Sequence, residues 1–343
     1  MVSSWFTALR WAAAVALVTV SVTPASAQKL DKITVGALAL SSSGAVFIAR
    51  DKGYFKEQGL DVETRIFTAA QQVPVAVTSG DVDFGVTGLT AGFYNLAGRG
   101  ALKIIAAQSR EAPGFQLVAY MVTKKAYDGG FTTLKDFAGK RVATTTTGST
   151  FHYSIGLLAQ KYGFDVKTVT LVALQSLPNM AAAFKGETVD ATLAPVTTAR
   201  ALLADGSGKI LGWVGDETPW QLGALFTRPQ VIQGKRAVVE RFIRAYQKGA
   251  RDYHLAFNAR DKGQEVRGPG YDEAIEILSK AINQPPNLVK IGLPYVDPEA
   301  RLDVGDIYNQ VAFWQSQNLV DKSVDAKSIL DLSFVKGHYN LPK

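Results

Sequence analysis

The chain has 343 residues, of which 47% are hydrophobic and 20% are charged, and its formal net charge is +7. This composition excludes disordered, collagen-like and coiled-coil proteins, and the length suits about two domains of roughly 150 residues each. Because the sequence contains no cysteine, disulfide frameworks, zinc ribbons, thiol nucleophiles and lipid attachment through cysteine are excluded as well.

Metal chemistry and nucleic-acid binding are not expected from the remaining residues. The three histidines, His152, His254 and His338, are far apart and form no H-E-x-x-H pattern, so we predict neither a metal site nor another cofactor. The basic residues are scattered rather than gathered in a stripe, which argues against a nucleic-acid partner. We interpret the positive charge mainly as a source of solubility, with a mild attraction for anionic ligands.

The first 27 residues have the pattern of a secretory signal peptide. Arg10 is the only charged residue before Lys29, the apolar run 11–20 follows it, and Pro24-Ala25-Ser26-Ala27 supplies an A-x-A cleavage pattern. The run is too short for a comfortable membrane span, which needs about 20 residues. We therefore expect a mature protein that starts near Gln28 and is located in a bacterial periplasm.

The mature part contains an internal repeat with an offset of about 104 residues. A strand at 33–37 leads into the hydroxyl-rich loop 41–44, and a strand at 141–144 leads into the loop 144–150 in the same way. The runs 59–64 and 163–168 correspond next, followed by 80–86 and 186–193. Each copy alternates strands with helices, which predicts parallel βαβ units. The predicted helices are 46–56, 72–79, 89–99, 151–162, 180–185 and 196–205.

The C-terminal part, from residue 231, has no counterpart in the repeat and shows helical spacing of apolar residues at 237–254, 271–282 and 302–317. We expect these helices to pack on the first lobe. The predicted domains are then a first lobe of residues 28–121 plus 225–343 and a second lobe of residues 122–224. Two extended crossings, near 120–124 and 222–228, would form a hinge beside a cleft.

The fold class predicts where a ligand would bind. In open parallel sheets, ligands bind beyond the carboxyl ends of the strands, against helix N-termini. The loops at those places are uncharged, and free N–H groups at a helix start can hold an anionic group. Ordinary N-capping would also explain serines and threonines there. The candidate ligand-binding residues in these loops are Ser41, Ser42, Ser43, Gln71, Thr87, Thr90, Thr145, Thr147, Gly148, Ser149, Thr150, Val196 and Thr197.

Three larger side chains complete the set of candidates. Phe151 and Trp220 could hold an apolar part of a ligand, although aromatic residues usually belong to the core. Arg110 follows the fourth strand of the first lobe and could form a bidentate pair with a carboxylate or sulfonate. It could equally pair with the neighbouring Glu111.

Two motifs resemble the sulfonate/nitrate/taurine family of substrate-binding proteins of ABC transporters. They are Lys52-Gly53-Tyr54-Phe55 with Gly59-Leu60-Asp61-Val62, and Ser79-Gly80-Asp81-Val82-Asp83-Phe84-Gly85; Leu134-Lys135-Asp136-Phe137 resembles the family's entry into the second lobe. The resemblance implies a periplasmic-binding-protein-like fold, with two α/β lobes joined by a two-strand hinge. It also implies ligand contacts from the loops at 41–44, 71, 87–90, 144–150 and 196–197.

The function that follows is a periplasmic solute-binding component of an ABC importer, without enzymatic activity. We predict a small organic anion (a sulfonate, carboxylate or aromatic acid) as ligand, hinge closure as mechanism, a membrane permease as partner, and a monomer. A periplasmic enzyme for a related molecule, a binder of a thiamine-pyrimidine precursor and a sensor subunit remain alternatives. The pyrimidine-synthase branch of the family uses a cysteine-rich motif, which this chain lacks.

Overall fold

The computed structural model describes residues 30–261 and 264–342. The predicted signal peptide, residues 1–27, lies outside the described residues. Within them, no helix combines the length and the apolar character that a membrane crossing requires.

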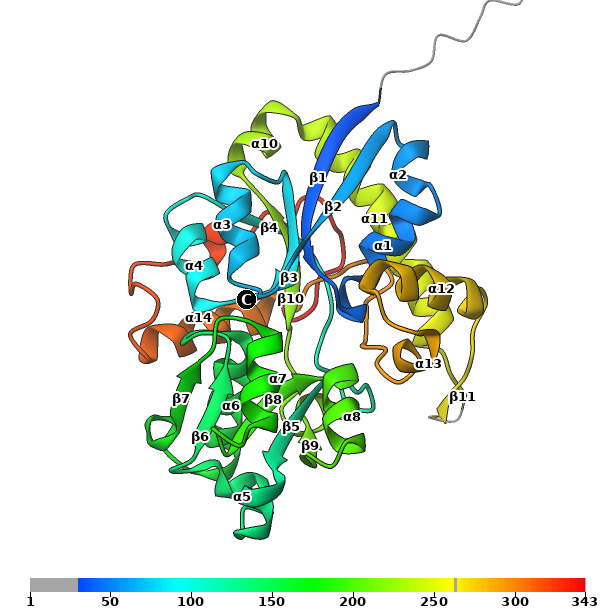
Figure 1. Ribbon diagram of the computed structural model, residues 1–343. Coiled ribbons are helices and arrows are strands. Elements are labelled where there is room, and N and C mark those ends of the chain that lie inside the picture. Colours follow the sequence, from blue (N-terminus) through cyan, green and yellow to red (C-terminus); the bar gives the residue numbers. More distant parts are fainter. Residues whose placement is uncertain (1–29, 262–263, 343) are drawn as a thin grey trace, which may run out of the picture.

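Two five-stranded mixed sheets, each flanked by helices, form two lobes (Figure 1). The first sheet has the order β2-β1-β3-β10-β4 and the second has the order β7-β6-β8-β5-β9. In each sheet one strand, β10 or β5, runs antiparallel to its neighbours. The strands of the first sheet are β1 (Asp31–Leu38), β2 (Leu60–Phe67), β3 (Phe84–Gly88), β4 (Lys103–Ala107) and β10 (Gly223–Thr227). Those of the second are β5 (Val118–Thr123), β6 (Arg141–Thr144), β7 (Thr170–Ala173), β8 (Ala191–Pro195) and β9 (Gly208–Trp213). The predicted two-lobed α/β fold is confirmed.

The central strands are buried on both faces, as their apolar sequences indicate. All residues of β5, β8 and β10 are buried. The helices of the first lobe are η1 (Ser41–Ser43), α1 (Gly44–Asp51), α2 (Tyr54–Glu57), α3 (Gln72–Ser79), α4 (Ala91–Gly98) and α10 (Pro229–Gly234). Those of the second are α5 (Lys124–Asp128), η2 (Leu134–Phe137), α6 (Thr150–Tyr162), η3 (Val166–Thr168), α7 (Leu177–Lys185), α8 (Val196–Ala204) and α9 (Val214–Glu217). The helix expected at 46–56 is divided into α1 and α2 because Gly53 adopts a left-handed backbone with φ of 78°.

The C-terminal part consists of α11 (Arg236–Phe257), the hairpin strands β11 (Arg260–Asp261) and β12 (Gln264–Glu265), α12 (Tyr271–Ile282), α13 (Pro286–Val289), α14 (Val304–Ser316) and η4 (Ala326–Ile329). Helix α11 packs closely on α1 of the first lobe. A Cβ added to Gly249 of α11 would lie 2.2 Å from the Ala45 carbonyl oxygen, and one added to Gly44 would lie 2.5 Å from the ring of Tyr253. The predicted packing of C-terminal helices on the first lobe is confirmed for α11.

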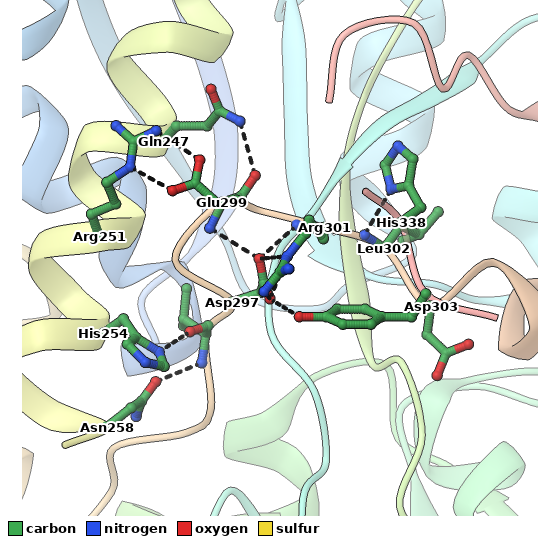
Figure 2. Close-up of polar contacts among 12 residues, drawn as sticks. Gln247, Arg251, His254, Asn258, Asp297, Glu299, Arg301, Leu302, Asp303 and His338 are labelled. Carbon is green, nitrogen blue, oxygen red and sulfur yellow. Dashed lines mark hydrogen bonds and ion pairs between the residues drawn. The ribbon is translucent and has the colours of Figure 1, made fainter. Parts of the chain in front are cut away.

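The segment that leads from α13 to α14 is fixed to α11 by polar contacts (Figure 2). Glu299 pairs with Arg251, and the Val296 carbonyl oxygen lies 2.9 Å from Nδ1 of His254. Asp297, which is 2% exposed, accepts hydrogen bonds from the guanidinium of Arg301 and from the hydroxyl of Tyr339. Burial alone would raise the pKa of Asp297, but these hydrogen bonds outweigh it and hold the pKa below its ordinary value. The carboxylate is therefore charged at neutral pH.

Two short segments connect the lobes and pair with each other. Glu111 and Trp220 exchange backbone hydrogen bonds of 3.0 Å in both directions, and the Gln108 N–H donates to the Gly223 carbonyl oxygen. Strand β5 lies wholly in the second sheet and β10 wholly in the first, so the chain changes lobe before each of these strands. The boundaries expected at 121/122 and 224/225 fall inside β5 and β10. The crossings lie upstream of both boundaries, because the two strands pair with sheet neighbours and the preceding residues pair with each other.

Helix α14 forms a third link between the lobes. On the side of the first lobe, the Tyr94 hydroxyl donates to Oε1 of Gln310 at 2.8 Å. On the other side, the ring of Phe313 lies 5.0 Å from that of Tyr153 in α6, and a Cβ on Gly156 would lie 2.2 Å from Phe313. The carboxylate of Asp306 accepts a hydrogen bond from the Gln221 backbone N–H in the second crossing. Burial raises the pKa of Asp306 to about 6.

The substitution Gly249→Ala tests the packing of α11 on α1. The added methyl group would meet the backbone of Ala45 and Ala49, which cannot yield without moving a helix, so we expect a loss of about 1–3 kcal/mol in the free energy of unfolding. Gly234→Ala is the matched control, because its Cβ would meet nothing within 4 Å. Urea unfolding curves measure both, and equal midpoints for the two variants would contradict the packing.

The substitution Glu111→Gln tests the burial of the first crossing. Glu111 is fully buried, and burial raises the pKa of its carboxyl well above the ordinary 4.5, more than the backbone N–H groups of Val118 and Gly215 lower it. The native state then keeps a proton that the unfolded state releases, so the wild-type protein should lose stability relative to Glu111→Gln as pH rises above 4.5. Unfolding free energies measured between acidic and neutral pH give the two curves. The unfolding free energy of the exposed control Glu276→Gln should depend on pH as that of the wild type does. If the curve for Glu111→Gln also follows the wild type, the Glu111 carboxyl is not buried as described.

Candidate functional site

A cavity of about 50 Å³ lies between the two lobes. The first lobe contributes Leu38, Leu40, Ser42, Ala69, Ala70, Thr87 and Gly88; the crossings contribute Gln108, Leu117 and Leu222; and the second lobe contributes Val118, Thr145, Thr150, Phe151, Leu177 and Pro195. Most of these side chains are apolar. The cavity is therefore a largely apolar space with a few polar groups, as ligand pockets usually are.

The fold brings strand ends of both sheets to this cavity. Leu38 ends β1, Thr87 and Gly88 end β3, and Pro195 ends β8. Helices begin directly after these strands, as the sequence predicted from the βαβ pattern. Because the first N–H groups of a helix have no partner within the helix and carry partial positive charge, the surroundings favour a negatively polarised group.

Two polar side-chain atoms of residues that line the cavity have no hydrogen-bond partner. The Thr87 hydroxyl and the Gln108 Oε1 atom are buried, and neither makes a hydrogen bond within the described residues. The amide nitrogen of Gln108 donates to the Ser43 hydroxyl at 3.4 Å, and its Oε1 atom lies against Gly223, where an added Cβ would be 1.9 Å away. An unpaired buried polar atom costs free energy, and a bound molecule that hydrogen-bonds to these two atoms would remove that cost.

The lining side chains carry no formal charge. His152, one turn into α6, is nearby in sequence, but burial lowers its pKa to about 4, so it is neutral at neutral pH. Its Nδ1 atom accepts a hydrogen bond of 3.1 Å from the Gly148 backbone N–H. The histidine thus holds the threonine-rich loop in place. In the part of the chain that the structure describes, no group of three or more His, Asp or Glu side chains could hold a metal ion.

The structure brings five of the predicted residues into the cavity wall: Ser42, Thr87, Thr145, Thr150 and Phe151. They come from the hydroxyl-rich loops of both lobes. The repeat and the loop composition therefore located both halves of the wall.

Four other predicted residues lie in the same loops, but their hydroxyl groups are occupied. Thr90 accepts a hydrogen bond from Phe93 N–H at 3.1 Å, and Ser149 accepts one from His152 N–H at 3.3 Å. Thr90 and Ser149 are the N-caps of α4 and α6, so N-capping accounts for both hydroxyl groups. Ser43 accepts from Gln108, and Ser41 donates to the Gly292 carbonyl oxygen.

Four predicted residues mark contacts between the lobes at the rim of the cavity. The Gln71 amide donates to the Gln175 carbonyl oxygen at 3.4 Å, and the Gly148 carbonyl oxygen accepts from Ala91 N–H at 2.8 Å. Val196 is in tight contact with Gly292, where an added Cβ would lie 2.1 Å from its Cγ1 atom, and Thr197 lies beside it. Thr147, in contrast, is exposed.

Arg110 and Trp220 lie outside the cavity, in the paired crossings. Arg110 forms an ion pair of 2.9 Å with Asp303 rather than with Glu111. Trp220 is 1% exposed and packs on Tyr153 with ring centroids 4.7 Å apart. Both residues join the hinge to the C-terminal part and to α6, while Nε of Arg110 and Nε1 of Trp220 make no hydrogen bond within the described residues.

Most of the apolar wall and Gln108 were not predicted from the sequence. Leu117, Val118 and Leu222 flank the crossings and reach the cavity only because the lobes face each other. Gln108 directly follows the buried strand β4, and a polar residue after such a run is a signal for a site at the strand end. The other apolar residues carry no local signal that separates a cavity wall from a core.

The comparisons with known proteins agree with this architecture. None of the curated protein sequences matches the chain. Among solved structures, the alkanesulfonate-binding protein SsuA from Xanthomonas axonopodis pv. citri, bound to MOPS, has a TM-score of 0.70 at 21% identity, covering 89% of this chain and 99% of that chain. The periplasmic aliphatic sulphonate binding protein SsuA from Escherichia coli has a TM-score of 0.67 at 16% identity, covering 91% and 97%. The periplasmic nitrate-binding protein NrtA from Synechocystis PCC 6803 has a TM-score of 0.69 at 14% identity, covering 88% and 85%.

These similarities show that the two lobes have the periplasmic-binding-protein fold. A family model described as "NMT1/THI5 like" matches residues 41–256, which is more than half of the sequence and includes every residue of the cavity wall except Leu38 and Leu40. The chain belongs to the NMT1/THI5-like family.

Proposed function

We propose that this protein is the periplasmic solute-binding component of an ABC importer and captures a small organic anion, a sulfonate, carboxylate or aromatic acid, between its lobes. The observation that carries the proposal is a cavity walled by both lobes that contains two buried, unpartnered polar atoms. The family and the named binding functions of the structural neighbours support it. The signal-peptide pattern of residues 1–27 supports export to the periplasm, where a membrane permease would receive the ligand from a monomeric carrier.

The state of the lobes supports closure as the mechanism. The Ala91–Gly148 hydrogen bond and the contact of Gly88 with Thr150, where a Cβ would lie 2.7 Å from the threonine methyl group, close the rim. The free space of about 50 Å³ between the lobes has room for only a few water molecules. A ligand therefore enters only when the lobes separate, and it stabilises the closed state by contacting both of them.

The chemistry of the wall supports an organic anion. Helix starts and hydroxyl groups can hold a sulfonate or carboxylate without a cationic side chain. The apolar wall, with Leu38, Leu117 and Phe151, suits a short hydrocarbon or aromatic body. We propose binding without chemical change, so mass spectrometry should recover the bound compound intact after long incubation.

The substitution Thr87→Val tests the cavity. A thermal-shift screen over sulfonates, aromatic acids and pyrimidines first provides a ligand, since binding raises the apparent stability. Removing the unpartnered hydroxyl should then weaken that ligand's affinity about five- to tenfold, equivalent to about 1 kcal/mol, without destabilising the free protein. Calorimetric titration measures the affinity. Thr147→Val is the matched control, because Thr147 is exposed and outside the cavity; equal losses in both variants, or none in Thr87→Val, would place the ligand elsewhere.

Small-angle scattering tests the closure. The free protein should sample separated lobes, so that a saturating ligand lowers the radius of gyration. The same ligand must be shown to bind by calorimetry in the same buffer. Superimposable profiles with and without a bound ligand would rule out hinge closure while leaving binding itself intact.

A further inference from the structure

A second hollow, which we call the basic pocket, lies beside the cavity and is also shared by the two lobes. It has a volume of about 610 Å³ and is lined by Phe115 and Gln116 of the first crossing, by Arg200 of α8, and by Arg260, Glu265 and Lys290 of the C-terminal part, among others. In Figure 1, α8 belongs to the lower lobe, and α13 and β11 lie to its right. We propose that the basic pocket is a separate binding site for a doubly charged oxyanion, such as sulfate or phosphate, and that the bound anion ties the two lobes together.

Arg200 is held in position without a counter-charge. One of its terminal nitrogens donates to Oε1 of Gln116 at 2.7 Å, and the guanidinium lies 5.3 Å from the ring centroid of Trp213. Both neighbours are uncharged. Among the described residues, no carboxylate lies within ion-pair distance of Arg200, so its positive charge remains available to a ligand.

The facing wall adds two more cations. The guanidinium of Arg260 lies 4.0 Å from the ring centroid of Phe115 and pairs at 3.0 Å with Glu265, whose side chain is 63% exposed. The Arg260 side chain is only 21% exposed, so solvent weakens this ion pair mainly through Glu265. Lys290, at the end of α13, makes no ion pair in the described part of the chain. Three cations thus face one solvent-exposed carboxylate.

The basic pocket is distinct from the cavity. The contact of Val196 with Gly292, and the hydrogen bond from Ser41 to the Gly292 carbonyl oxygen, stand between them. Leu117 lines the cavity, whereas the preceding Gln116 lines the basic pocket. The two sites therefore share a wall but no side chain.

Because the three cations come from different lobes, anion binding in the basic pocket depends on how close the lobes are to each other. Arg200 belongs to the second lobe, whereas Arg260 and Lys290 belong to the C-terminal part that packs with the first. Closing the lobes brings like charges together, which costs free energy unless an anion lies between them. Arginine recognises oxyanions through paired N–H donors and lysine acts as a point charge, so a group with two negative charges and several oxygens fits best.

The experiment titrates sodium sulfate and sodium phosphate by calorimetry, at an ionic strength held constant with sodium chloride so that general screening does not change. Wild-type protein should bind one anion, and Arg200→Gln/Lys290→Gln should bind it about tenfold more weakly or not at all. The control Lys56→Gln/Arg99→Gln removes the same charge from exposed positions outside the pocket and should bind as the wild type does. No binding by the wild type, or equal binding by both double variants, would overturn the proposal.

Two further measurements distinguish anion binding in the basic pocket from binding in the cavity and from the effect of a folding defect. Lys290→Gln alone removes no hydrogen bond or ion pair of the described residues, so a weaker affinity in this variant cannot come from lost internal contacts. Thr87→Val should bind sulfate normally. If sulfate binding is instead lost in Thr87→Val and kept in Arg200→Gln/Lys290→Gln, the anion lies in the cavity, which overturns the basic pocket but not the proposed function. Glycerol phosphate, compared with inorganic phosphate, shows whether the free ion or a larger phosphate-bearing molecule is preferred.

Discussion

The backbone pairing of the two crossings is the constraint on which the rest of the structure depends. Glu111 and Trp220 hold the two segments together through reciprocal hydrogen bonds, and each segment then enters the sheet of the other lobe as its antiparallel strand. This exchange fixes the direction in which both sheets present their strand ends. The cavity follows from it, because strand ends and helix starts of the two lobes must then face each other.

The C-terminal part adds a second level of restraint on the same hinge. Arg110 of the first crossing pairs with Asp303, and Gln221 of the second donates to Asp306. Helix α14, which begins at these acidic residues, also packs Phe313 against α6 of the second lobe. The network around Asp297 (Figure 2) fixes the segment before α14 to α11. Any movement of the lobes therefore turns about crossings that Arg110 and Gln221 hold to the C-terminal part.

The two hollows between the lobes differ in their electrostatics. The cavity has no charged lining residue and relies on hydroxyl groups, an amide and helix starts. The basic pocket has three cations and lies on the other side of the Val196–Gly292 contact. An uncharged, desolvated site can select a ligand by shape and hydrogen bonds, whereas a wider charged site attracts anions at longer range.

The sequence by itself determined the features that depend on local pattern. The repeat at an offset of about 104 residues predicted the two α/β lobes. Gly53 and the N-cap residues Thr90 and Ser149 act through local backbone geometry. The hydroxyl-rich loops placed five residues of the cavity wall at the strand ends: Ser42, Thr87, Thr145, Thr150 and Phe151. The tertiary structure alone decided which residues meet across long separations. Arg110 and Asp303 are 193 positions apart, and Ser41 and Gly292 are 251 apart; no periodicity or motif links them. Leu117 and Leu222 line a cavity rather than a core only because the two lobes face each other. That arrangement is set by packing between helices and strands rather than by the local preferences of any one of them.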